Sequence, residues 1–170
     1  MNKALDNKNL IIVLLIAMTI WGISWPNAKI IGKYASYEIL IFWRFLFSAA
    51  TIFIFAFFLK IQLKPSKKIF FYAILSSMFV ILYNVNYFKG TQVGLAGIGG
   101  VIVPTLSPIC TYLLTLLLKI EKFKKIDFFS FFMAILGGGI LIRTWEISWQ
   151  DLIYSGNIYY IIAATTWSIV

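Results

Sequence analysis

The chain has 170 residues, of which 61% are hydrophobic and only 12% are charged, and its mean hydropathy is +0.90. Soluble domains carry about a quarter of their residues as charged side chains, so this composition excludes a soluble domain. With no histidine and one cysteine, Cys110, the chain lacks imidazole ligands for haem or zinc and cannot form an internal disulfide. We therefore expect an all-α membrane protein that has the lipid bilayer as a partner and binds no metal and no cofactor.

Five apolar runs are long enough to cross about 30 Å of hydrocarbon as helices, which takes about 20 residues each. In chain order they cover residues 10–28, 39–59, 69–88, 97–118 and 128–142. The fifth run is short and spans only with help from residues near Arg143 or where the bilayer thins locally. A sixth apolar run follows and reaches Val170; it begins at Asn157 or, alternatively, at Leu152.

Positive charge alternates between the segments that connect these runs. The N-terminus and the loops after the second and fourth runs carry ten lysines, whereas the loops after the first, third and fifth runs carry four cations. Cytoplasmic loops are enriched in Lys and Arg, so we predict a multi-pass protein of the cytoplasmic (inner) membrane with a cytoplasmic N-terminus. The same alternation explains the net charge of +9. We therefore do not expect nucleic acid as a partner.

A short internal repeat links the first and sixth runs. Residues 16–24 (IAMTIWGIS) and 162–170 (IAATTWSIV) are identical at five of nine positions, all at an offset of 146. Because five is an odd number, a second unit would enter the membrane from the opposite side, as inverted repeats of secondary transporters do. We divide the chain into a first five-helix unit, residues 1–146, and an incomplete first helix of a second, inverted unit, residues 152–170. We accordingly expect a truncated product or one half of a split protein.

The first run contains a proline among polar and aromatic residues. Pro26 has no N–H group and is predicted to bend the helix. Bends at membrane depth are favoured where they line a cavity. The neighbouring residues that are candidates for a substrate path are Trp21, Ser24, Trp25 and Asn27.

Charged and aromatic residues near the ends of the first two runs have competing interpretations. Arg44 lies inside the second run, where a cation is costly unless it reaches the headgroups, pairs or faces a wet interior. It either attracts an anionic group of a substrate, or it reaches the outer headgroups or pairs with Glu38. For Trp25 and Lys29 we favour an interfacial aromatic belt and a helix anchor.

Polar residues also gather in the third and fourth runs. Ser77, Asn84 and Tyr87 share one helical face, which we expect to point into the bundle. That face either binds a ligand or holds neighbouring helices together. The candidate cavity-lining residues from these two runs are Tyr83, Asn84, Tyr87, Ser107 and Thr111.

Small residues recur in the fourth and fifth runs, where they permit close helix packing. Ala96, Gly100, Pro104 and Pro108 are spaced by four residues. Pro108 is predicted to kink the helix, whereas Pro104 is harmless if the helix starts near Val101. Three consecutive glycines, residues 137–139, predict close packing of the fifth run.

These motifs resemble the EamA-type transporters of the drug/metabolite transporter superfamily. The resemblance rests on WG at 21–22, RF at 44–45, YFKGTQVGLAGIGGVIVPTLSPI at 87–109, LLLKIEKF at 116–123 and the glycine-rich fifth run. A departure is that Tyr37 and Glu38 stand where a proline often precedes the arginine. The resemblance implies a ten-helix carrier of two inverted halves that moves small metabolites such as amino acids, often outward, through a cavity between the halves.

The leading interpretation is a secondary transporter of small metabolites, or a truncated half of one, that works by alternating access. Its partners are then the metabolite and either a second five-helix half or a second copy, although the loop charges oppose a copy inserted in the opposite orientation. The alternative is a non-transporting membrane subunit or an inactive truncated remnant. An enzyme is not expected, since the sequence has no phosphate-binding glycine loop and no nucleophile with a partnering base.

Overall fold

The computed structural model describes residues 7–61, 64–146, 148, 150 and 156–170, and this part of the chain is helical and contains no strand. Within it, the five helices α1 to α5 are long and apolar enough to cross a membrane. The protein is therefore an all-α, multi-pass membrane protein, as the composition predicts. The elements are α1 (Asn7–Ile31), α2 (Tyr37–Phe58), α3 (Lys67–Val93), α4 (Ala96–Leu117), α5 (Lys125–Ile142), the 3-10 helix η1 (Thr144–Glu146) and α7 (Asn157–Trp167).

The fifth span is longer than the sequence suggests. α5 begins at Lys125, and its 18 residues cover about 27 Å, close to the thickness of the hydrocarbon core. Its start is fixed by Asp127, whose carboxylate accepts a hydrogen bond from the backbone N–H of Lys124 at 2.7 Å. The Tyr112 hydroxyl of α4 donates a second hydrogen bond to the same carboxylate. These two bonds hold the first turn of α5 against α4.

The buried residues of α3 lie in its C-terminal half. Asn84 and Tyr87 are buried there, but Ser77 is exposed and its hydroxyl bonds to the carbonyl of Ile74 at 2.7 Å. The prediction that Ser77 points into the bundle is therefore wrong, because the other helices cover α3 only beyond this point. α3 also continues to Val93, past the predicted end at residue 88.

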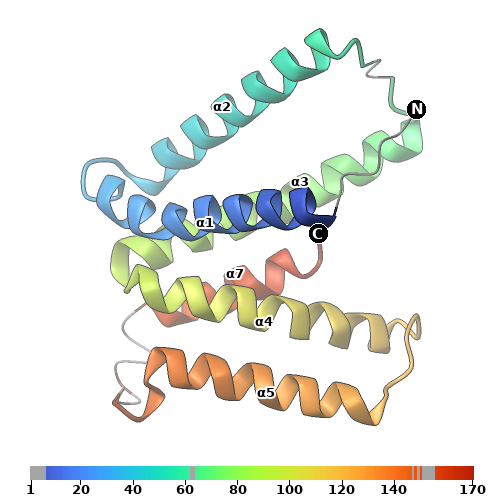
Figure 1. Cartoon of the computed structure of the whole chain (residues 1–170). Helices are drawn as coiled ribbons and strands as arrows, with labels where there is room; N and C mark the ends of the chain where they lie inside the picture. Colours follow the sequence, from blue (N-terminus) through green and yellow to red (C-terminus); the bar gives the residue numbers. More distant parts are fainter. Residues whose placement is uncertain (1–6, 62–63, 147, 149, 151–155) are drawn as a thin grey trace.

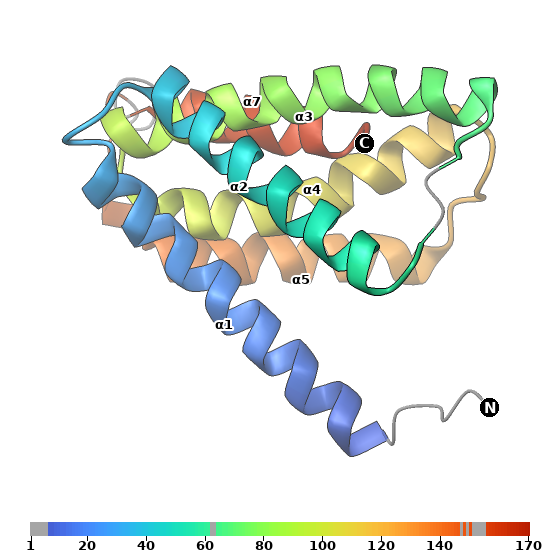
Figure 2. The same cartoon turned by 90° about the horizontal axis from the view of Figure 1, so that it is seen from above.

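The helices form a bundle in which α7 packs along α3 and α4 (Figure 1). α5 packs on α4, α2 packs on α3, and α1 crosses α3 and α4. Seen from above, the N-terminal half of α1 projects away from the other helices (Figure 2). Its side chains from residue 10 to residue 20 are all exposed.

The core lies where the C-terminal halves of α1 and α3 meet α4 and α7. Trp25 is only 3% exposed, and its ring lies 4.7 Å from that of Tyr87 and 5.8 Å from that of Tyr160. The assignment of Trp25 to an interfacial belt is therefore wrong. The indole fits because Gly99 of α4 leaves room for it: a Cβ atom at that position would lie 2.6 Å from the Trp25 ring.

Two predictions about the small residues need correction. α4 begins at Ala96, so Pro104 lies in the helix interior and not in a first turn starting near Val101. In α5, a Cβ atom at Gly138 would lie 3.3 Å from Thr105 of α4, whereas Gly137 faces open space. Close packing is thus confirmed for Gly138 and not for Gly137.

α1 and α4 continue as single helices through Pro26, Pro104 and Pro108, and the predicted kinks stay predictions.

α7 starts at Asn157, the later of the two predicted starts, after Gly156 with a φ of 80°. This positive φ favours glycine and interrupts the helix. A Cβ atom at Gly156 would also lie 2.9 Å from the backbone nitrogen of Gly94. The predicted start at Leu152 falls among residues 151–155, which lie outside the described residues.

Candidate functional site

A cavity of about 710 Å³ lies between α1, α2 and α3 and brings four of the predicted residues together. They are Ser24 and Asn27 on α1, Arg44 on α2 and Tyr87 on α3. The rest of the lining is apolar and comes mainly from Ala28, Ile31, Ala35, Ile39, Leu40, Trp43, Phe47 and Phe88. The cavity lies toward the end of the bundle where α1 connects to α2.

Arg44 is held by aromatic rings. Its guanidinium carbon lies 5.2 Å from the centroid of the Tyr87 ring and 5.8 Å from that of Phe88, which is within the range of cation–π attraction. In the described part of the chain the one ion pair joins Arg143 to Glu146 at 2.6 Å, so pairing of Arg44 with Glu38 is excluded. Arg44 comes six positions after Glu38, which places the two residues on different faces of α2.

Tyr87 connects the site to α1. Its hydroxyl donates a hydrogen bond to the backbone carbonyl of Ser24 at 3.1 Å. The Ser24 hydroxyl in turn donates to the carbonyl of Trp21 at 2.5 Å. Trp21 is partly exposed one turn before Trp25. These bonds fix the phenol ring of Tyr87 next to Arg44.

The predicted residues of α4 lie elsewhere. Ser107 and Thr111 line a second cavity of about 680 Å³ between α4 and α7. The Ser107 hydroxyl donates to the carbonyls of Val103 at 2.7 Å and Ala164 at 3.4 Å, and the Thr111 hydroxyl donates to the carbonyl of Ser168 at 3.5 Å. Both hydroxyls therefore bind α4 to α7.

The two remaining predicted residues of α3 are in the core. The Tyr83 ring lies 4.8 Å from the ring of Trp167 on α7. Asn84 is 2% exposed, and its amide nitrogen donates to the carbonyl of Val80 at 2.8 Å. Within the described residues, the side-chain oxygen of Asn84 has no hydrogen-bond partner.

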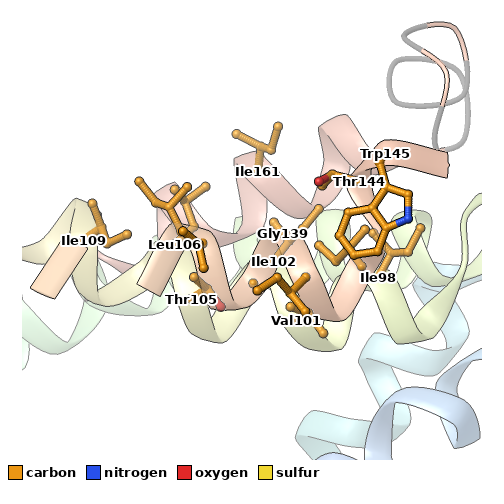
Figure 3. Close-up of a pocket in the computed structure, with 15 residues that line it drawn as sticks. Ile98, Val101, Ile102, Thr105, Leu106, Ile109, Gly139, Thr144, Trp145 and Ile161 are labelled. Carbon is orange, nitrogen blue, oxygen red and sulfur yellow. The ribbon is translucent and has the colours of Figure 1, made fainter. Parts of the chain in front are cut away.

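A third cavity, of about 530 Å³, lies between α4 and α5 and is lined mainly by aliphatic side chains. Figure 3 shows Thr144 and Trp145 at one end and Ile109 toward the other. None of its described lining residues is charged. The cavity between α4 and α7 is also polar and includes Glu121, but the hydroxyls of Ser107 and Thr111 are used in bonds between these two helices. The cavity next to Arg44 is therefore the candidate site for a polar solute.

Two features of this end of the bundle escape prediction from the sequence. Lys29 does hold a helix end, but that of α3: its amine donates to the carbonyls of Gln92 at 2.9 Å and Gly94 at 2.8 Å. The Gln92 amide donates back to the carbonyls of Gly32 at 3.3 Å and Ala35 at 3.0 Å. The second feature is the aromatic lining beyond the predicted Tyr87, from Trp43, Phe47 and Phe88; its sequence signal is that Trp43 directly precedes Arg44.

The chain matches none of the curated proteins and none of the solved structures. The EamA-like transporter family matches residues 8–143. This range takes in nearly all of α1 to α5 and every residue of the cavity between α1, α2 and α3. With five apolar helices and a match over most of its length, the chain belongs to the EamA-like transporter family and is a membrane transporter of the drug/metabolite type.

Proposed function

We propose that the chain forms one unit of a secondary transporter of small metabolites such as amino acids, with the cavity between α1, α2 and α3 as a solute site. The supporting observation is that Ser24, Asn27, Arg44 and Tyr87 converge there from three helices. Polar and charged groups within membrane spans are costly and mark solute paths. The surrounding walls are apolar, which is typical of a small-molecule site with a few placed polar groups.

Transport proceeds by alternating access between this unit and a second, inverted five-helix unit. The odd number of spans supports the inversion. The repeat of α1 residues in α7 supports the duplication, since five of nine positions are identical. The exposed N-terminal half of α1 offers the second unit an apolar surface.

The N-terminus lies in the cytoplasm of a cell whose inner membrane holds the protein. This orientation is supported by the ten lysines of the N-terminus and of the loops after α2 and α4, because cytoplasmic loops are enriched in Lys and Arg. The connections from α1 to α2 and from α3 to α4 are then external. The cavity next to Arg44 lies at this external end, where a solute leaves or enters.

The test is solute flux through vesicles reconstituted with the chain and the second five-helix unit that copurifies with it from its own membrane, measured with radiolabelled amino acids. We expect flux above that of protein-free vesicles, and a loss of about tenfold or more in Arg44→Gln, since hydrogen bonds to a charged group contribute about 1.5–3 kcal/mol. Arg143→Gln is the matched control, because Arg143 lies outside the cavity in an exposed ion pair. Folded protein without flux would contradict the proposal and favour a non-transporting subunit or an inactive remnant.

A further inference from the structure

The lining of the cavity next to Arg44 also constrains the charge of its ligand. We infer that this site binds organic anions, each with a planar anionic group such as a carboxylate and an apolar body, and that it requires no amino group on the ligand. The inference rests on the proposed function in taking the same cavity as the solute site. It goes further by naming the ligand class.

The first argument is that the charge of Arg44 is not neutralised by the protein. The described lining of the cavity contains no Asp or Glu. The acidic residue on the same helix, Glu38, forms no ion pair with Arg44 in the described part of the chain. A cation inside a membrane span is costly unless it is paired or hydrated, so a bound anion would supply the missing charge.

The second argument is the geometry of the guanidinium group. Arginine stacks on aromatic faces and presents N–H groups in a planar fork that matches a carboxylate. Tyr87 and Phe88 provide the aromatic faces, 5.2 Å and 5.8 Å from the guanidinium carbon. The hydrogen bond from Tyr87 to the Ser24 carbonyl holds one of these rings in place. Arg44 is thus positioned to bind a planar anion in a bidentate manner, through two parallel N–H···O hydrogen bonds.

The third argument is that the site offers no partner to a ligand whose only charge is an ammonium group. Aromatic faces attract cations, but the Arg44 guanidinium already lies at the faces of Tyr87 and Phe88, whereas the carboxylate of an amino acid still finds Arg44. Lys29 and Lys89 lie at the same end of the bundle, at the C-terminus of α3 and near the Tyr37 ring respectively. Together these positive charges attract anions toward the cavity.

The apolar body of the ligand has its own place in the cavity. Ile39, Leu40, Trp43 and Phe47 line the α2 side, and the volume of about 710 Å³ is in the range of small-molecule sites. Asn27 and Ser24 add neutral hydrogen-bonding groups that do not select for a charged amine. A ligand with one anionic end and one apolar end therefore satisfies both parts of the lining.

The experiment compares three probes with the same ring and similar length: phenylacetate, phenylacetamide and phenethylamine. Their dissociation constants for the purified full chain in detergent are measured by titration calorimetry. We expect phenylacetate to bind at least about tenfold more tightly than the amide or the amine. Equal affinities, or tighter binding of the amine, would overturn the inference.

Two variants assign the preference to Arg44. Arg44→Gln should bind the three probes equally, whereas Arg143→Gln should keep the preference for phenylacetate. If Arg44→Gln loses its helical circular dichroism, Arg44→Lys replaces it and should weaken phenylacetate binding several-fold, because lysine lacks the planar fork. A preference that survives the Arg44 change would refute the assignment.

The same probes separate this inference from the proposed function. Selective phenylacetate binding without flux of any labelled solute in vesicles would leave the anion site standing and contradict transport. Flux that proceeds while phenylacetate and phenethylamine bind equally would leave transport standing and contradict the anion site.

Discussion

Tyr160 shows how single glycines determine the packing of this molecule. Its ring is fully buried, and its hydroxyl donates to the carbonyl of Leu95 at 3.1 Å. A Cβ atom at Gly90 of α3 would lie 2.6 Å from the Tyr160 ring, and one at Gly99 of α4 would lie 2.4 Å from it. The absence of side chains at these two positions gives α7 its place between α3 and α4.

At the residue scale, Gly99→Ala should destabilise the fold by about 1–3 kcal/mol, because the added methyl group overpacks the core. The Cβ atom added at position 99 would also lie 2.6 Å from the indole ring of Trp25. Gly97→Ala is the matched control, since a Cβ atom there meets nothing within 4 Å. The measurement is unfolding of both variants in a detergent titration followed by circular dichroism. Equal stability of the two variants would disprove this role of Gly99.

Some residues of the candidate site are visible in the sequence, and others are not. Ser24, Asn27, Arg44 and Tyr87 stand out because polar residues are conspicuous in apolar helices. Their meeting is not visible, since the bond from Tyr87 to Ser24 joins positions 63 residues apart. For the same reason the sequence does not distinguish the buried Trp25 from a tryptophan of an interfacial belt.

At the scale of the helices, the five spans follow from the apolar runs, because about 20 apolar residues and a bilayer leave few alternatives. The helix ends follow less well. Asp127 directly precedes the fifth apolar run, but the sequence does not show that its carboxylate caps the first turn of α5. The extension of α3 to Val93 depends on Lys29 of another helix, which binds the last carbonyls of α3.

Lys29→Met should therefore loosen the C-terminal turn of α3 and lower stability by about 1–2 kcal/mol. The methionine keeps the aliphatic stem but removes a charged donor at the negative end of a helix dipole. Hydrogen exchange of the amides at residues 89–94 should accelerate. Lys33→Met, which changes an exposed lysine, should leave these amides unchanged. Equal exchange in both variants would show that Lys29 does not hold this helix end.

At the scale of the whole molecule, α1 and α7 share sequence but not surroundings. Ala163 and Ala164 of α7 are fully buried, whereas Ala17 of α1, which is equivalent to Ala163, is exposed. The repeat therefore predicts a related helix without predicting what covers it. This difference is expected if the α1 surface packs against a unit other than its own.

Reporter fusions test the orientation of the unit. Fusions after Lys64 and after Lys125 should both report cytoplasm, and a fusion after Arg143 should report the external side, because the lysine-rich loops stay inside. An external signal after Lys64 or Lys125 would reverse the assignment of the two membrane faces.

The most direct test of the solute site is whether water reaches the cavity between α1, α2 and α3 in the membrane. Cys110 is the single cysteine, so Cys110→Ser gives a background in which Asn27→Cys or Phe42→Cys carries the only thiol. Asn27 lines the cavity, whereas Phe42, which is about as far from the start of α2 as Asn27 is from the end of α1, has an exposed side chain that is not part of the cavity lining. A charged, membrane-impermeant maleimide added to intact cells should modify the thiol at position 27 and spare the one at position 42, since a thiol in lipid does not ionise. Equal modification of both positions, or of neither, would contradict a water-filled solute site next to Arg44.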